Sequence, residues 1–545
     1  MKLFRFLTPG SNAGWVRLVL VSMLSGLTNA GILMIVTVAT RSAYGTALSV
    51  WLFFVFLLTV VIYYVSQRLA FAMVSADVEN TVHRTRVRIL SLVRRCELIT
   101  IEALGETRIL AAMTGDAQQL SQAMNQVTAG LQSVLVAVIT GLYIAWLSRP
   151  AFMLWVFVVA VSALVILREW GASQRLLTQA GAADSAFQEM TSGLLLGFKE
   201  VKLSRGRADA LSTALNNLAG QARTARIKAA SGMSRSYVFG QVLFFLLVGS
   251  MVFLLPGLGD LNAETLKEAT TAVLFVLGPV SMIVGAVPAV ASAEAAAKSL
   301  SALESALAEQ IAAEEDAALP SSAQGFKRLE LVDAQFSYPN GERGSGFRLG
   351  PINFHVDAGE TVFITGGNGA GKSTFLRLLT GLYRPQSGTV RLNGHVLHPA
   401  EMQEFRDRIA TVFADYHLFR TLYGVEIDVA EATELIDWME VAGKAAIQDG
   451  AFTTIALSTG QRKRLALIAA VLEHKPLLVL DEWAADQDPG FRRKFYEVIL
   501  PSLKRRGIAI VAATHDDRWF GVADRHVRLF EGTLEEQPRT EGPGA

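Results

Sequence analysis

The sequence predicts an α-helical membrane domain followed by an α/β domain. Hydrophobic residues make up 51% of the 545 residues and charged residues only 18%, and the apolar residues concentrate before about residue 300. That part contains apolar windows long enough to cross a bilayer, whereas the remainder has a globular composition and includes a β-branched strand that runs into a glycine-rich loop. We therefore expect a membrane domain at 1–300, a linker at 301–325 and an α/β domain at 326–545.

The membrane domain is predicted from the length of its apolar windows. A hydrocarbon core about 30 Å thick is crossed by roughly twenty helical residues. A charged residue at a helix centre costs about 2.5–3.5 kcal/mol, and the stretch from Ala117 to Ser148 contains none. We predict six spanning helices, at about 18–40, 47–67, 128–148, 151–167, 236–256 and 269–292.

The charges between these windows predict the orientation. The connections at 68–108 and 168–228 carry many arginines and lysines, whereas the other connections are short and nearly uncharged. The positive-inside rule then places both termini and the two long loops in the cytoplasm. We read these loops as helical extensions that turn back near 114–116 and near 196–200, and we expect the turns to dock on the α/β domain.

Net charge and cysteine content exclude some classes of protein. The formal net charge is +1, which argues against a nucleic-acid partner, since such proteins usually carry a basic excess. The single cysteine, Cys96, excludes an intrachain disulfide and any multi-cysteine metal site.

A phosphate-binding loop follows the strand at 362–365 and runs into the apolar helix at 375–379. In this strand–loop–helix context, glycines let backbone N–H groups converge on phosphate oxygens at a helix N-terminus. Lys372 is expected to contact the β- and γ-phosphates of ATP, and Ser373 to bind Mg²⁺. The predicted nucleotide-binding residues here are Gly366, Gly367, Asn368, Gly369, Ala370, Gly371, Lys372, Ser373 and Thr374.

Two carboxylates end the apolar strand at 477–480. Ligands of open α/β sheets bind at the carboxyl ends of the strands, so Asp481 and Glu482 are placed near the phosphate loop. Asp481 is expected to hold the metal, and Glu482 to orient and polarise the attacking water.

Three further features resemble the ATP-binding-cassette (ABC) proteins. The segment Leu457-Ser458-Thr459-Gly460-Gln461 resembles their LSGGQ signature motif, which implies that Ser458, Thr459, Gly460 and Gln461 contact ATP. His515, after the strand at 508–511, resembles the switch histidine that senses the γ-phosphate. Tyr338 resembles the aromatic residue that stacks on adenine. The resemblance covers about 327–535.

The order of the two domains resembles a type IV ABC exporter. The signature motif of one cassette completes the ATP site of another in this family, so one cassette per chain implies a homodimer in the lipid bilayer. The finer resemblance is to the bacterial cyclic-peptide and siderophore-precursor exporters, the group of the syringomycin, pyoverdine and microcin exporters. It rests on three segments, at 197–203, 412–419 and 481–489, including Trp483-Ala484-Ala485 after Glu482. It implies export of a peptide-like small molecule across the bacterial inner membrane.

Two residues depart from the family pattern. Ala414 stands where a glutamine usually contacts Mg²⁺, and the adjacent Asp415 is a candidate metal contact. Thr459 replaces a glycine of the signature motif. The alternative functions are a lipid or lipid-linked flippase, an ATP-driven switch that transports nothing, and a heme or thiol exporter.

Overall fold

The computed structural model describes residues 12–41, 46–257, 263–311, 325–338 and 347–538. The chain divides into two compact units. The first comprises Met1–Arg95 and Leu104–Ala308, and the second comprises Cys96–Ala103 and Glu309–Ala545.

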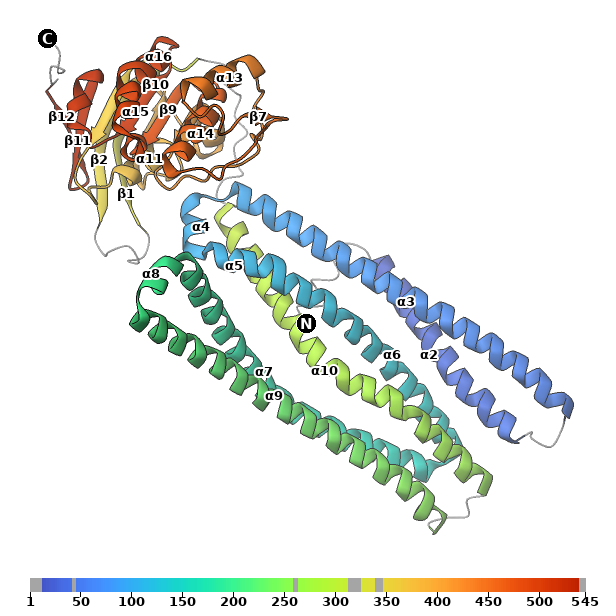
Figure 1. The fold of residues 1–545 in the computed structure, drawn as a ribbon. Helices are drawn as coiled ribbons and strands as arrows, with labels where there is room; N and C mark the ends of the chain where they lie inside the picture. The colour runs from blue at the N-terminus through green and yellow to red at the C-terminus, as the bar shows by residue number, and fades with distance from the viewer. Residues whose placement is uncertain (1–11, 42–45, 258–262, 312–324, 339–346, 539–545) are drawn as a thin grey trace. The chain divides into compact units, whose positions relative to one another are not determined.

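The first unit is entirely helical in its described residues (Figure 1). At 1.5 Å per residue, its helices of 48 to 50 residues are about 70 Å long, more than twice the thickness of a bilayer core, so they continue well beyond the membrane. The main helices are α2 (Asn12–Arg41), α3 (Thr46–Arg95), α6 (Ala117–Leu147), α7 (Arg149–Leu196), α9 (Arg205–Phe253) and α10 (Ala263–Ile311).

Five helical stretches of the described residues are long and apolar enough to cross a membrane: Val50–Arg95, Glu106–Leu147, Arg149–Leu196, Arg205–Phe253 and Thr265–Glu309. A shorter apolar stretch, Met23–Ala39, lies within α2, which is 30 residues long. The predicted helical membrane domain is confirmed.

The first predicted loop turn was misplaced. Residues 114–116 lie in the π-helical turn η1 (Ala112–Asp116), which joins α5 (Glu106–Ala111) to α6 without a reversal. The chain breaks instead between α3 and α5, around the short helix α4 (Leu98–Leu104) and Gly105, whose φ is 80°. Thr-Gly-Asp is a turn-like sequence, but Gly115 does not take a positive φ and the helix passes through it. The second turn lies where predicted, because α7 ends before Gly197 and α8 (Phe198–Leu203) follows.

The cassette contains a six-stranded sheet of order β12-β11-β3-β10-β9-β6. All neighbouring pairs are parallel except β11 with β12. All five residues of β3 are buried, and its three apolar residues alternate between two hydrophobic clusters, since Phe363 faces one and Val362 and Ile364 face the other. The strands are β3 (Thr361–Thr365), β6 (Ile409–Val412), β9 (Leu477–Asp481), β10 (Ala509–Ala513), β11 (Arg525–Phe530) and β12 (Thr533–Gln537).

A second, antiparallel sheet has the order β2-β1-β4-β5, and β7 pairs with β8 in a small hairpin. These strands are β1 (Arg328–Ser337), β2 (Arg348–Asp357), β4 (Ser387–Leu392), β5 (His395–Val396), β7 (Ile447–Gln448) and β8 (Ala451–Phe452). The helices of the cassette are α11 (Lys372–Leu379), α12 (Met402–Arg406), α13 (Val429–Trp438), α14 (Thr459–Leu472), α15 (Pro489–Lys494) and α16 (Leu500–Arg505), with π-helical η5 (Phe495–Ile499) between the last two.

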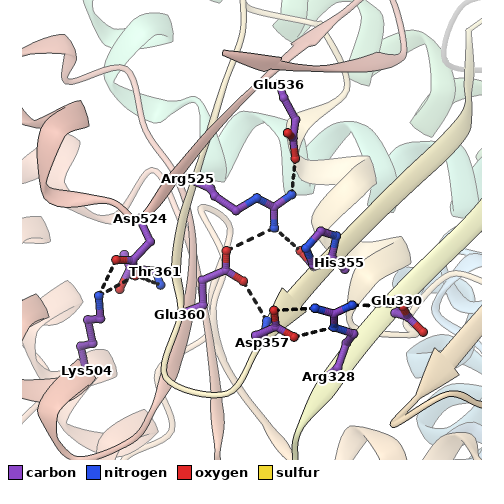
Figure 2. Close-up of polar contacts among 10 residues, drawn as sticks. All are labelled: Arg328, Glu330, His355, Asp357, Glu360, Thr361, Lys504, Asp524, Arg525 and Glu536. Atoms are coloured by element: carbon purple, nitrogen blue, oxygen red, sulfur yellow. Dashed lines mark hydrogen bonds and ion pairs between the residues drawn. The ribbon is translucent and has the colours of Figure 1, made fainter. Parts of the chain in front are cut away.

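An ionic network ties the two sheets of the cassette together (Figure 2). Arg525 on β11 contacts Glu360, Glu536 on β12 and the backbone carbonyl of His355 on β2. Arg328 on β1 pairs with Asp357 at the end of β2 through two hydrogen bonds of 2.5 and 2.8 Å. In the same view, Lys504 lies 2.6 Å from Asp524, whose carboxylate also accepts from the backbone N–H of Thr361.

Candidate nucleotide-binding site

The phosphate loop has the backbone that its glycines predict. Gly366 and Gly371 have φ values of 154° and 103°. A Cβ at Gly366 would lie 2.3 Å from the carbonyl oxygen of Leu529, and one at Gly371 would lie 2.5 Å from the Phe347 ring. A side chain at Gly366 would displace the backbone of Leu529, and one at Gly371 would push the Phe347 ring aside. Both positions also have a positive φ that favours glycine.

Lys372 is the first residue of α11, and its side chain is only 6% exposed. Its ammonium group lies 3.2 and 3.3 Å from the carbonyl oxygens of Gly366 and Gly367. It also lies 2.9 Å from Nε2 of His515 and 3.4 Å from a carboxylate oxygen of Glu482. The cation is therefore held beside the loop whose amides suit phosphate oxygens.

Ser373 and Asp481 meet although they are 108 positions apart in the chain. The Ser373 hydroxyl donates to one Asp481 oxygen at 2.7 Å. Asp481 is 2% exposed, and its other carboxylate oxygen is buried and accepts no hydrogen bond of normal geometry in the described structure, although the Ala414 backbone N–H is close enough to lower the pKa of the carboxyl group. Burial raises the pKa of this carboxyl group above its ordinary value, while the Ser373 hydroxyl lowers it and the adjacent Glu482 carboxylate raises it.

This pair fits Mg²⁺. Within the described ranges, no group of three or more His, Cys, Asp or Glu residues is arranged to hold a metal by itself. Mg²⁺, however, is usually held by one or two carboxylates together with phosphate oxygens and several waters. One hydroxyl and one carboxylate with a free buried oxygen, next to a phosphate loop, match that requirement.

Glu482 and His515 lie together at the carboxyl ends of β9 and β10. Nε2 of His515 is 3.1 Å from the Glu482 carboxylate. The parallel register brings them together, because Asp481 pairs with Ala513 on the neighbouring strand. Glu482 has a left-handed backbone, with φ 49° and ψ 37°, which is uncommon for a residue other than glycine and is concentrated at functional sites.

Tyr338 follows β1 and lies near the phosphate-loop helix. Its hydroxyl is 2.9 Å from that of Thr374, and its ring packs edge-on against Phe336 and Tyr383.

A separate cleft of about 550 Å³ lies over the first half of the phosphate loop. Its lining includes Phe347, Arg348, Gly367, Asn368, Gly369 and Ala370. Sequence reasoning did not single out Phe347, because no local pattern marks it.

The signature segment begins helix α14. Ser458 is the N-cap, and it forms a reciprocal capping box with Gln461, the two hydrogen bonds being 3.4 and 3.5 Å long. Ser458 and Thr459 are exposed. A Cβ at Gly460 would lie 2.6 Å from the carbonyl oxygen of Asp486, so this glycine permits close contact with the segment that follows Glu482. Within the described chain, the signature residues form no hydrogen bond with the phosphate loop, and the structure does not join these two groups.

Asp415, the candidate metal contact, pairs with an arginine in this structure. Its carboxylate is 69% exposed and pairs with the guanidinium of Arg377 at 2.7 Å rather than with Ser373 or Asp481. Arg377 also lies 3.5 Å from Glu102, and the Tyr383 hydroxyl donates to Glu102 at 2.9 Å. Glu102 belongs to Cys96–Ala103, the short segment that groups with the cassette. Longer-range pairing with an arginine decided the position of Asp415, which adjacency to Ala414 alone could not predict.

The comparisons with known proteins agree with this architecture. Residues 349–485 match the ABC transporter family. The chain is 32% identical over 466 residues to "ATP-binding protein SyrD" of Pseudomonas syringae pv. syringae, an alignment that covers 83% of this chain and 82% of SyrD. It is 27% identical over 431 residues to an "ATP-dependent lipid A-core flippase" of Idiomarina loihiensis, covering 74% of this chain and 71% of the flippase.

A solved structure shares the whole fold. A bacterial Atm1-family ABC exporter with ATP bound superposes with a TM-score of 0.76 at 17% identity, covering 97% of this chain and 96% of that chain. The protein thus has the type IV ABC exporter fold, with a P-loop ATP-binding cassette after the helical membrane domain. The chain belongs to the ABC exporter family, in the group of SyrD. It binds ATP, couples ATP hydrolysis to transport and is a multi-pass membrane protein.

Proposed function

We propose that this protein exports a peptide, either a cyclic or nonribosomal peptide or a siderophore precursor, across the bacterial inner membrane. The observation that carries the proposal is the similarity to SyrD, which spans both the membrane helices and the cassette. The sequence features that resemble the peptide-exporter group include Trp483-Ala484-Ala485 in place of the usual residues after the catalytic glutamate.

In the proposed ATP site, the phosphate loop holds the phosphates and Tyr338 stacks on adenine. Lys372 neutralises phosphate charge, and Glu482 orients the attacking water while His515 contacts the γ-phosphate. Ser373 and Asp481 would hold Mg²⁺, which would supply charge stabilisation to the phosphate groups. Asp415 is given no part in metal binding because its carboxylate pairs with Arg377.

The proposed working unit is a homodimer. Each chain provides one phosphate loop and one signature segment, Ser458–Gln461, whose first two residues are exposed, and the two do not meet within the chain's described contacts. A second copy would bring the signature segment of one cassette to the phosphate loop of the other, so that two ATP molecules are enclosed. Closure would then open the membrane helices outward, and hydrolysis would reset them, with both termini and both long loops in the cytoplasm.

Transport of a lipid or lipid-linked cargo is the second candidate. The lipid A-core flippase similarity favours it, since that alignment also extends over about three quarters of this chain. Both candidates share the ATPase machinery and differ only in the cargo, so the test must identify the cargo.

The test is comparative mass spectrometry of cells and medium from three strains: a deletion, the deletion with the wild-type gene, and the deletion with Glu482→Gln. Peptide export predicts that one peptide accumulates inside the deletion and Glu482→Gln strains and reaches the medium only with the wild-type gene. Unchanged peptides together with an altered glycolipid would reject peptide export in favour of the flippase. A Glu482→Gln strain that exports as well as wild type would reject the role of Glu482.

A further inference from the structure

A buried lysine joins the signature helix to the backbone of the proposed catalytic glutamate. Lys463 lies in the first turns of α14 and is 4% exposed. Its ammonium group donates to the carbonyl oxygen of Glu482 at 2.9 Å and lies 2.7 Å from an Asp486 carboxylate oxygen. None of the phosphate-site roles proposed above uses this cation.

Both backbone polar groups of Glu482, its N–H and its carbonyl, form hydrogen bonds. Its backbone N–H donates to the Ala513 carbonyl at 3.0 Å, and its carbonyl accepts from Lys463. Glu482 needs such support because a left-handed backbone is strained for a residue other than glycine. Hydrogen bonds that involve a charged group are about twice as strong as neutral ones, which suits Lys463 to hold this conformation.

Trp483, the residue after Glu482, forms a second hydrogen bond between this segment and Lys463. The Trp483 indole N–H donates to the carbonyl oxygen of Lys463 at 2.9 Å, and Trp483 is 1% exposed. Its ring packs against Phe495 with centroids 4.4 Å apart. Lys463 and the Glu482–Trp483 pair thus exchange two hydrogen bonds, one in each direction.

Two further contacts fix the start of α14 against the same segment. The buried Gln487 side chain donates to the Gly460 carbonyl at 3.1 Å and accepts from Arg464 at 2.9 Å. Gly460 also approaches the Asp486 carbonyl so closely that a Cβ there would clash. The signature residues and the glutamate therefore belong to one packed substructure.

We propose that Lys463 is a positioning residue for Glu482, and that through it the signature segment of a cassette controls the geometry of hydrolysis in the same cassette. The inference rests on the proposed roles of Glu482 and the signature segment. A signature segment engaged by ATP bound to a second copy would then stabilise the active placement of Glu482 on its own side, which links the two ATP sites.

The variant that tests this is Lys463→Met in the full-length protein reconstituted in lipid nanodiscs. Methionine fills similar volume but donates no hydrogen bond. We expect kcat for ATP hydrolysis to fall by about 10- to 100-fold, because a misplacement of about 1 Å can cost 10²-fold. The KM for ATP and the affinity for a fluorescent ATP analogue should change by less than about twofold, since no phosphate contact is lost.

Two controls and one substitute variant separate positioning from general structural damage. Lys494→Met removes a lysine that pairs with Glu440 at 2.7 Å in the same domain, and it should leave kcat within about twofold. Lys463→Arg restores charged donors and should recover part of the lost kcat. If Lys463→Met does not fold, Lys463→Gln takes its place. The glutamine side chain is one atom shorter and uncharged, so a loss of kcat at constant KM is again expected.

Wild-type kcat in Lys463→Met or Lys463→Gln would overturn the inference, as would a loss shared equally by kcat and ATP affinity. Glu482→Gln is measured beside them. If Glu482→Gln lacks turnover while the Lys463 variants keep it, only the positioning role fails. If Glu482→Gln hydrolyses ATP as wild type does, the proposed catalytic role fails and the positioning role fails with it.

Discussion

Two groups of charged residues in the cassette differ in how completely their charged atoms are paired with one another. In the network of Figure 2, Arg328 on β1, Arg525 on β11 and Lys504 on α16 each pair with a carboxylate from another segment of the cassette. At the phosphate loop, Lys372 contacts two backbone carbonyls, His515 and, at 3.4 Å, the Glu482 carboxylate, while one oxygen of Asp481 is buried without a hydrogen-bond partner in the described structure. Buried polar groups without partners are costly, and they persist where function requires them. The difference indicates that the first group stabilises the fold, while the second is arranged for a ligand.

The largest effect that would sharpen this comparison is expected from Asp481→Asn. Asparagine preserves the shape of the aspartate side chain but removes the charged ligand for Mg²⁺. Metal-assisted charge stabilisation is worth several kcal/mol. We expect Mg²⁺-dependent ATP hydrolysis to fall by about 10³-fold, while ATP binding without Mg²⁺ is retained. Asp524→Asn, from the satisfied network, is the matched control and should keep turnover within about twofold. Equal losses in the two variants would break the distinction between the groups.

Lys372→Ala should produce the next largest effect, on nucleotide binding. A charge-assisted hydrogen bond to phosphate contributes about 1.5–3 kcal/mol, so we expect affinity for ATP to fall by about 10- to 100-fold. Titration with a fluorescent ATP analogue measures this loss. Lys504→Ala removes a lysine paired with Asp524 and should leave affinity unchanged. A Lys372→Ala protein that binds ATP as tightly as wild type would contradict the assignment of the phosphate site.

Arg525→Met should affect stability rather than activity. Arg525 connects β11 to β2 and β12, but it is partly exposed, so solvent screening limits its contribution to about 1 kcal/mol. We expect the cassette transition in thermal unfolding to fall by about 2–4 °C, with kcat and KM for ATP unchanged. A large loss of hydrolysis without loss of stability would mean that this network also takes part in function.

The smallest effect is a dependence of stability on acid pH. The hydrogen bond from Arg328 lowers the pKa of Asp357 below its usual value of 3.8, and Arg525 likewise lowers the pKa of Glu536 below 4.5. Groups with a lowered folded-state pKa contribute stability above the unfolded pKa and lose it as pH falls through the folded one. We expect Arg328→Met to have less effect on the unfolding temperature at about pH 3 than at about pH 7, as measured by scanning fluorimetry. An equal effect at both pH values would exclude this ion pair as the cause.

Much of the fold and part of the site follow from local sequence. The apolar windows predict the membrane helices because hydrocarbon excludes charge over a fixed thickness. The second loop turn was predicted at 196–200, where Gly197 ends α7. The first was not, since Gly115 fits a helix and the break lies at Gly105. A glycine signals that a turn is permitted there, but only packing decides whether the chain takes it.

The sequence by itself determined the phosphate loop, the carboxylates after β9 and the capped start of α14, because short-range backbone geometry and hydrogen bonding govern each of them. The tertiary structure alone decided which distant groups meet. It joined Ser373 to Asp481, Lys463 to the Glu482 carbonyl, and Asp415 to Arg377. These contacts depend on the order and register of the strands and on the packing of α11 and α14. No single segment of the chain encodes the strand order or the helix packing. Both arise when the sheet and its helices bury the two hydrophobic clusters between them.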